Sequence, residues 1–276
     1  MTLCQLIKKV LDEQHAEVPD KNRDQAIKQQ LELLSKWYAN LKSTKCPGVD
    51  YGSPASRFAY IRRYTVAHAD YVSQVIQDSP ALTEVFGKDD IQAACLGGGP
   101  GSDFLGMLKY MNAHGKKSSL TCYLFDRERA WADSWGDVAR LLETEFRFYP
   151  SFCHMDATDP ETYKMYGRFL KADVFTLIYF MSELRTRRRK AEPFFDHCFA
   201  GAKEGALVVY IDNRDPEFRG WFDSLAKRNG IKLLEQRSCE MVFEGAEQNT
   251  DLGEYFGKFG WLKPKGKVDI RVGRKA

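Results

Sequence analysis

The apolar and polar positions of the chain divide it into two parts with different periodicities. In residues 1–88, apolar side chains recur at the three- and four-residue spacing of amphipathic helices, for example at Trp37 and Leu41. A further helix is predicted over 53–77, where aromatic and aliphatic side chains share one face. We therefore predict that residues 1–88 form an N-terminal helical segment that caps the rest of the chain.

Residues 89–276 alternate short apolar runs with longer amphipathic stretches. This alternation predicts a parallel sheet with right-handed crossovers. Runs that are apolar throughout are typical of strands covered on both faces. The predicted strands are 91–96, 120–125, 148–154, 173–180 and 206–211. The predicted helices are 102–113, 129–146, 160–170, 186–203 and 216–229.

The C-terminal end departs from this alternation. Residues 231–243 and 267–272 predict two more strands, and no periodic helix lies between them. An antiparallel pair at the sheet edge fits this pattern better than another crossover unit. The predicted fold class is therefore α/β: a Rossmann-like, mostly parallel seven-stranded sheet with helices on both faces and an antiparallel last strand, behind the N-terminal helical segment.

The composition of the chain indicates a cellular compartment but does not indicate a function. The net charge is only +3, from 41 basic and 38 acidic residues, so a polyanionic partner is neither required nor excluded. The seven cysteines include no C-x-x-C pair, which predicts a reducing compartment and no structural metal. No apolar window reaches the ~18 residues of a membrane span, and the first apolar run is too short for a signal peptide. We expect a cytoplasmic or nuclear protein without a membrane partner.

The strongest motif is a glycine loop after the first predicted strand. It reads Leu96-Gly97-Gly98-Gly99-Pro100-Gly101-Ser102-Asp103 and leads into a predicted helix. Glycines allow a sharp turn and the close approach of a ligand to the backbone. The helix N-terminus then presents free N–H groups and a partial positive charge. Three glycines also form ordinary turns, so the motif gains weight only from its context.

An acid at the end of the second predicted strand supplies that context. Asp126 follows Leu120–Phe125 directly, 25 residues after Gly101. A carboxylate at this position can accept both ribose hydroxyls of a nucleoside-containing cofactor. The alternative is a solvated acid at the start of the next helix.

The glycine loop, with Gly97, Gly99 and Gly101, resembles motif I of the class I S-adenosylmethionine (SAM)-dependent methyltransferases, and Asp126 occupies the place of the ribose-binding acid of that family. The segment His154-Met155-Asp156-Ala157 resembles the part that holds the adenine. The resemblance implies that Asp156 bonds the adenine amino group while Met155 packs on the ring. It also implies SAM as cofactor and methyl transfer as the activity.

One position departs from the family pattern. The family often has an acid two residues before the first motif glycine, where this chain has Cys95. Asp103 can partly substitute near the methionine amino group of the cofactor. The alternative is that Asp103 is a first-turn helix acid, which the helix dipole favours in any case.

The predicted transfer site is the C-terminal end of the fourth strand, where open sheets bind ligands. Ser182 and Glu183 are the candidate catalytic residues, because they can orient a polar group and Glu183 can accept a proton. The alternative is a helix N-cap serine followed by a first-turn acid. Asp212 and Asn213, after the next strand, are weaker candidates of the same kind.

Basic residues gather in two places. Arg185, Arg187 and Arg188 begin the helix after the predicted transfer site and can hold phosphates. Lysines and arginines of 258–275 lie near the aromatic residues of 255–261, a mixture that suits single-stranded nucleic acid. Solvated helix faces and a charged tail are the alternatives. Arg62, Arg63, Tyr64 and His68 can cap the cofactor or belong to a packed amphipathic helix.

Four functions compete. The leading hypothesis is a methyltransferase acting on RNA at a base nitrogen. The second keeps the enzyme and makes the acceptor a small molecule or a protein side chain. The third is a non-catalytic binding subunit of the same fold, which Cys95 would favour. The fourth, a nicotinamide dehydrogenase, expects a third glycine where this chain has Ser102.

Overall fold

The computed structural model describes residues 2–19, 21–40, 49–116, 118–142, 146–243, 245, 248–260 and 262–276. Helices precede the sheet, as the periodicity of residues 1–88 predicts. They are α1 (Leu3–Glu17), α2 (Arg23–Ala39), α3 (Pro54–Tyr60), a π-helical turn (Ile61–Thr65), α4 (Val66–Asp78) and α5 (Pro80–Val85).

The strands form one seven-stranded sheet with the order β3-β2-β1-β4-β5-β7-β6. Their bounds are β1 (Asp90–Leu96), β2 (Ser119–Asp126), β3 (Phe148–His154), β4 (Val174–Ile178), β5 (Leu207–Asn213), β6 (Ile231–Val242) and β7 (Lys265–Lys275). Strands β1 to β5 pair in parallel, and β7 lies between β5 and β6, antiparallel to both. The predicted fold class is confirmed, including the antiparallel last strand.

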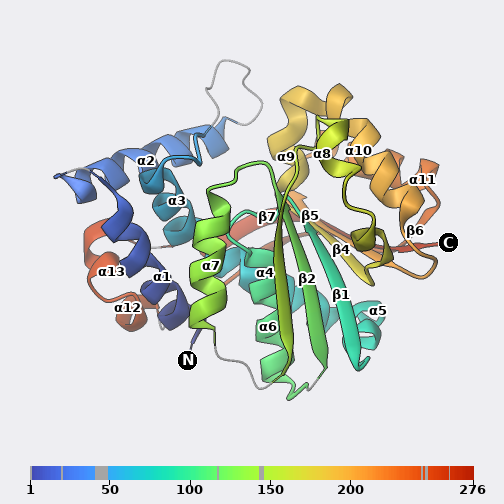
Figure 1. The fold of residues 1–276 in the computed structure, drawn as a ribbon, viewed down its shortest axis with the longest axis horizontal. Helices are drawn as coiled ribbons and strands as arrows, with labels where there is room; N and C mark the ends of the chain where they lie inside the picture. Colours follow the sequence, from blue (N-terminus) through green and yellow to red (C-terminus); the bar gives the residue numbers. More distant parts are fainter. Residues whose placement is uncertain are drawn as a thin grey trace.

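Helices cover both faces of this sheet (Figure 1). Helices α4, α6 and α7 belong to the apolar core on one face, and α10 and α11 to the core on the other. The elements between and after the strands are α6 (Ser102–Ala113), α7 (Trp131–Leu141), α8 (Pro160–Tyr163), a 3₁₀ turn (Arg168–Lys171), α9 (Phe180–Leu184), a 3₁₀ turn (Arg185–Arg187), α10 (Arg188–Gly201), α11 (Pro216–Arg228), α12 (Gln248–Asp251) and α13 (Glu254–Phe259).

The predicted helix 160–170 is wrong as one continuous element. It is a single turn and a 3₁₀ turn, with Gly167 before the second. Tyr163 and Phe169 are both buried. In one α-helix, side chains six residues apart point about 120° away from each other. Breaking the helix lets both aromatic rings reach the same core.

Other predicted bounds shift for local reasons. The predicted strand 173–180 ends at Ile178, because Tyr179 adopts a left-handed conformation with φ 55° and α9 begins at the next residue. The predicted helix 186–203 begins as a 3₁₀ turn before α10. The predicted helix 129–146 ends at Leu141, and its residues 143–145 lie outside the described residues.

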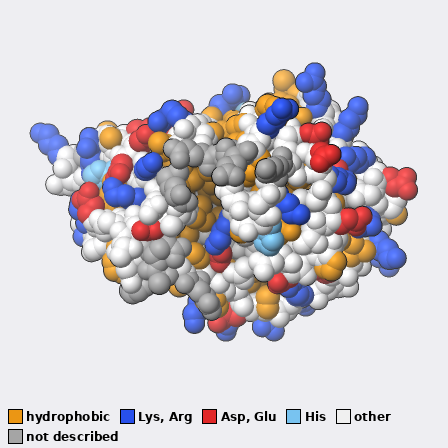
Figure 2. Space-filling view, turned by 90° about the horizontal axis from the view of Figure 1, so that it is seen from below, with side chains coloured by type: hydrophobic (Ala, Val, Ile, Leu, Met, Phe, Trp, Pro, Cys, Tyr) orange, Lys and Arg blue, Asp and Glu red, His pale blue; other side chains and the backbone are white. Residues whose placement is uncertain are grey.

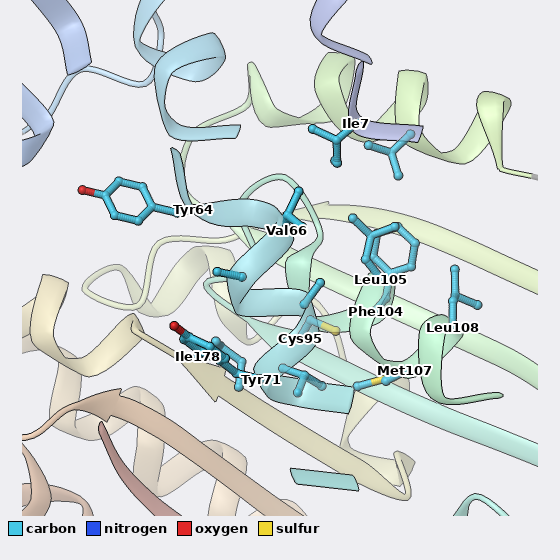
Figure 3. Packing of buried hydrophobic residues seen from close by; sticks show 14 of the residues in the cluster. Ile7, Tyr64, Val66, Tyr71, Cys95, Phe104, Leu105, Met107, Leu108 and Ile178 are labelled. Carbon is cyan, nitrogen blue, oxygen red and sulfur yellow. The ribbon is translucent and has the colours of Figure 1, made fainter. Parts of the chain in front are cut away.

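The N-terminal helices share one apolar core with the sheet. In Figure 3, Ile7 of α1 and Val66 of α4 lie beside Phe104 and Leu105 of α6, above Cys95 of β1. The division at residues 88 and 89 is therefore not a gap in the packing, and two separate domains stay a prediction from the sequence.

Helix α4 approaches α6 closely because Gly106 has no side chain. A Cβ built on Gly106 would lie 2.4 Å from the Ala69 carbonyl oxygen and 2.6 Å from Val72 Cβ. Since both contacting atoms belong to a packed helix, neither can move without shifting α4.

The part of the chain that the structure describes has no helix long and apolar enough to cross a membrane. On the face seen in Figure 2, basic and acidic side chains are interspersed.

Replacing Gly106 by alanine is expected to lower the free energy of unfolding by about 1–3 kcal/mol, because the new methyl overpacks the α4–α6 contact. Urea unfolding measures this change. The matched control is Gly220→Ala in α11, where a Cβ meets nothing within 4 Å. That variant is expected to gain about 0.5–1 kcal/mol from helix propensity. Equal effects at the two glycines would contradict the close contact.

Candidate active site

The glycine loop forms a tight turn between β1 and α6. Gly97, Gly99 and Gly101 have φ values of 70°, 47° and 86°, in the left-handed region. A Cβ on Gly97 would lie 2.0 Å from Cδ2 of Phe180, so glycine is needed where the start of α9 packs over the loop. Gly101 is the N-cap residue of α6. The three positive φ values therefore let the chain turn from the carboxyl end of β1 into α6.

Asp126 closes the other side of this loop. Its Oδ2 accepts a hydrogen bond from the Gly99 N–H at 3.0 Å, and Oδ1 accepts one from the Glu128 N–H at 2.9 Å. Burial raises the pKa of the Asp126 carboxyl to about 6, against these two hydrogen bonds, which lower it. The acid is thus fixed to the loop, and each carboxylate oxygen keeps a further lone pair for a ligand.

The segment after β3 lies next to Asp126. The Met155 N–H donates to the Asp126 carbonyl at 2.9 Å, and the Met155 side chain is buried. Asp156 Oδ1 accepts the N–H and hydroxyl of Thr158 at 2.8 and 2.7 Å. A buried apolar side chain and a preoriented carboxylate therefore follow β3, and their contacts with an adenine stay a prediction.

Asp103 occupies a different environment. It is buried in the first turn of α6, and its Oδ2 accepts the Thr176 hydroxyl at 2.5 Å. Burial raises the pKa of this carboxyl to about 7. Asp103 does not line the cavity described below, and its predicted role near the cofactor stays a prediction. At Cys95, where the sequence departs from the family pattern, Sγ lies 3.5 Å from Cys122 Sγ inside the core.

The end of β4 turns sharply into the predicted transfer site. The Ser182 N–H donates to Oδ2 of the buried Asp212 at 2.9 Å, and Asn213 Nδ2 donates to the Ser182 hydroxyl at 3.3 Å. These three predicted residues are therefore one hydrogen-bonded group that fixes the first turn of α9. Burial raises the pKa of Asp212 to about 6.

Glu183 lies one residue further on and faces side chains of the N-terminal helices. Its Oε1 accepts the Tyr38 hydroxyl at 2.6 Å, and that hydroxyl lies 3.3 Å from the Tyr51 hydroxyl. Burial raises the pKa of Glu183 to about 7; the Tyr38 hydrogen bond lowers it, and the Asp126 charge raises it further. Glu183 is therefore a carboxyl that can exchange a proton near neutral pH.

These elements surround one cavity of about 300 Å³. Most of the predicted site residues line it, namely Gly97, Gly99, Asp126, Met155, Asp156, Ser182, Glu183 and Arg187. Side chains that the sequence did not single out complete the wall, namely Trp37, Tyr51, Tyr60 and Trp131. Tyr51 and Tyr60 are recognisable in the sequence as aromatic residues near a predicted helix. The same pattern is typical of a helix that packs in a core, so it does not identify a cavity wall.

None of the four predicted capping residues, Arg62, Arg63, Tyr64 and His68, lines the cavity. Arg62 is buried and donates to the backbone carbonyls of Tyr255 and Gly260, away from the cavity. His68 stacks on Tyr179 with ring centroids 4.1 Å apart, and burial lowers its pKa to about 3, so it is neutral.

The predicted phosphate-binding arginines have different surroundings. Arg187 is exposed and lines the cavity. Arg185 lies 3.7 Å from Glu217. Arg188 pairs with Glu192 at 3.1 Å and lies over the Trp221 ring. The structure thus brings one of the three to the cavity.

The basic and aromatic residues near the C-terminus pack against other parts of the chain. Tyr255 and Phe259 contact the ring of Phe58. Arg271 pairs with Asp223 at 3.0 Å. Trp261 lies outside the described residues. The short helices α12 and α13 are therefore a packing partner of α1 and α3.

Replacing Asp103 by asparagine is expected to change how stability depends on pH. The folded pKa of about 7 exceeds the ordinary 3.8. The folded state therefore binds the proton more tightly, and this stabilisation, up to about 4 kcal/mol, is present below pH 4 and lost as pH rises to about 7. The variant keeps an oxygen acceptor for Thr176 and should lose less stability than the wild type between pH 4 and pH 8 in urea unfolding. Asp133→Asn, at an exposed acid of α7, is the control, and equal pH slopes for all three proteins would contradict the prediction.

No protein-family model and no curated protein matches this chain. Solved structures do match. An O-methyltransferase family protein from Burkholderia thailandensis has a TM-score of 0.50 and 15% identity, over 96% of this chain and 76% of that one. A SAM-dependent methyltransferase from Clostridium acetobutylicum has a TM-score of 0.48 and 10% identity, over 89% and 98%. Precorrin-6y C5,15-methyltransferase from Geobacter metallireducens has a TM-score of 0.47 and 11% identity, over 74% and 88%. The first of these likenesses, together with the strand order of the sheet, shows that the chain has a Rossmann-like methyltransferase fold.

Proposed function

We propose that the chain is a SAM-dependent methyltransferase. The observation that carries the proposal is that the glycine loop, Asp126, Met155, Asp156 and the end of β4 all line one cavity. A Rossmann-like sheet alone hosts many functions, so the fold does not decide the matter. A site whose residues match the successive parts of one ligand is stronger evidence for a function than the fold alone.

The residues fit the cofactor part by part. Gly97 and Gly99 line the cavity where a methionine tail would lie, and the Asp126 carboxylate suits the ribose hydroxyls. Met155 offers an apolar surface for the adenine, and the Asp156 carboxylate an acceptor for its amino group. When bound, SAM supplies a methyl group on a positively charged sulfur. The residues of this chain position the acceptor and exclude water from it.

Two classes of acceptor have support. RNA at a base nitrogen is favoured by Arg187 at the cavity and by Arg189 and Lys190, which are exposed nearby. A small molecule or a protein side chain is favoured by the lining itself, which contains five carboxylates and two guanidinium groups. Such a lining disfavours phosphates inside the cavity, because like charges repel. The second class therefore fits the cavity better, and RNA is the alternative to test.

Calorimetric titration with SAM tests the proposal. The wild type is expected to bind, and Asp126→Ala to bind about a hundredfold more weakly, because two hydrogen bonds to a charged group are worth about 1.5 kcal/mol each. Asp133→Ala is the control, since this exposed acid does not line the cavity. Absence of SAM binding by the wild type would refute the proposed function. Binding without methyl transfer to any acceptor would favour the non-catalytic alternative.

A further inference from the structure

Three aromatic rings form one wall of the cavity. Tyr51 precedes α3, Tyr60 ends α3, and Trp131 begins α7. Their ring centroids lie 5.2 Å apart for Tyr51 and Trp131, 5.4 Å for Tyr51 and Tyr60, and 5.7 Å for Tyr60 and Trp131. The rings are inclined to each other by 43°, 88° and 65°. We call these three residues the aromatic wall. Because the planes are inclined, the wall is a cup rather than a flat stack.

A carboxylate lines the same cavity as the aromatic wall. Glu183 Oε1 is held by Tyr38, while Oε2 has no hydrogen-bond partner among the described residues. Burial, and after it the Glu183 charge, raise the pKa of Tyr51 and Tyr60, so both hydroxyls stay protonated and both rings stay neutral. The cavity thus combines neutral aromatic rings with one carboxylate oxygen that remains available.

The charges around the cavity differ between its rim and its interior. Arg127 and Arg187, the two cationic residues that line it, are both exposed, whereas Glu183 is partly buried. Asp126 and Asp156 are assigned to the cofactor under the proposed function. Of the other acids in the lining, Asp50 and Glu128 each accept a backbone N–H of their own turn, from Gly52 and Ala130. Glu183 is the acid whose charge raises the pKa of both Tyr51 and Tyr60, so it is the one we assign to a second ligand at the aromatic wall. Aromatic rings together with a carboxylate are the combination that recognises an ammonium group.

We propose that the aromatic wall and Glu183 form the acceptor site, and that the acceptor is an amine that enters as its ammonium ion. This inference rests on the proposed function and names the substrate class of the same cavity. The Glu183 carboxylate takes one proton from the ammonium and becomes a carboxylic acid. The nitrogen lone pair then forms a bond to the methyl carbon while the carbon–sulfur bond breaks. The electron pair of the broken carbon–sulfur bond stays on sulfur, which becomes a neutral thioether.

Tyr38 acts in this scheme as a positioning residue. Its hydroxyl donates to Glu183 from α2, so the N-terminal helical segment orients the carboxylate that the end of β4 provides. It does not line the cavity. Removing its hydroxyl should therefore change the proton affinity of Glu183 without removing any wall of the acceptor site.

Binding of choline and of its neutral isostere 3,3-dimethylbutanol tests the acceptor site. Both are titrated into the full chain saturated with S-adenosylhomocysteine. Failure of the chain to bind S-adenosylhomocysteine would refute the proposed function, and this outcome is distinct from a failure of the acceptor site. Choline is expected to bind about tenfold more tightly than the isostere. Tyr51→Leu and Tyr60→Leu should each remove most of this preference, whereas Tyr51→Phe and Tyr60→Phe should retain it. Equal affinity of the wild type for the two probes, or binding of neither, would overturn the proposal even if the leucine variants fail to fold.

Methyl transfer separates amines from the other acceptor classes. Labelled SAM is supplied with a panel of primary amines, secondary amines and imidazoles, with catechol, and with transcribed transfer RNA. Label on an amine supports the proposal. Label confined to catechol or to RNA overturns it, and the RNA result would restore the hypothesis of a base acceptor.

The dependence of kcat on pH tests Glu183 and Tyr38. The proton acceptor must be ionised, so kcat is expected to rise as pH rises through about 7, the raised pKa of Glu183. The groups whose charges or hydrogen bonds act on it are Tyr38, Arg127, Asp126 and Asp212. Glu183→Gln should lower kcat about 10²–10⁴-fold and remove this rise.

Tyr38→Phe should shift the midpoint of the rise of kcat with pH upward by roughly half a pH unit or more. In the wild type the Tyr38 hydrogen bond lowers the pKa of Glu183, and the variant loses this hydrogen bond. A structural role alone would lower kcat without moving the midpoint, and an unmoved midpoint would contradict the positioning role. Ser35→Ala, at an exposed position of α2 away from the cavity, is the control.

Discussion

The close contact between α4 and α6 determines where the N-terminal helices lie on the sheet. At Gly106 the backbone of α6 approaches the Ala69 carbonyl oxygen and the Val72 side chain of α4, with no Cβ of α6 between them. Helix α6 begins at the glycine loop, and α4 continues from the π-helical turn after Tyr60. The contact therefore fixes the distance between the loop and the aromatic wall. An enclosed cavity needs this fixed distance, because either side alone is an open surface.

The same enclosure explains the raised carboxyl pKa values. Asp126 and Glu183 line the cavity, whereas Asp103 and Asp212 are buried behind it in contact with Thr176 and Ser182, and burial is the largest cause of each raised pKa. Water that would stabilise their charges is displaced by aromatic and aliphatic side chains. Backbone N–H groups offset part of this cost at Asp126 and Asp212, whereas Glu183 has the Tyr38 hydroxyl. A positively charged ligand would offset the rest, which a neutral or anionic ligand cannot do.

Much of the fold, and the side of the cavity that the strand ends form, could be predicted from the sequence because both depend on local patterns. Apolar runs place β1, β2 and β3 within a residue of their bounds. Carboxyl ends of parallel strands meet at one edge, so Gly97, Asp126, Asp156 and Glu183 had to come together. The aromatic wall could not be predicted in this way. Tyr51, Tyr60 and Trp131 meet only because helices far apart in sequence dock on one face, and nothing local to each residue distinguishes a cavity wall from a core.

The π-helical turn at Ile61–Thr65 extends the aromatic face of this helix toward the end of β4. In an α-helix, four residues exceed one turn by about 40°, so side chains four apart drift steadily round the axis. A π-helical turn holds about one more residue, so four residues fall short of a full turn instead. The two deviations oppose each other along Tyr60, Tyr64 and His68, whose neighbouring rings lie 5.3 and 5.6 Å apart. His68 then stacks on Tyr179, the residue whose positive φ ends β4. A row of rings thus connects the aromatic wall to the turn that presents Ser182 and Glu183, so the N-terminal segment and the strand ends form one packed site.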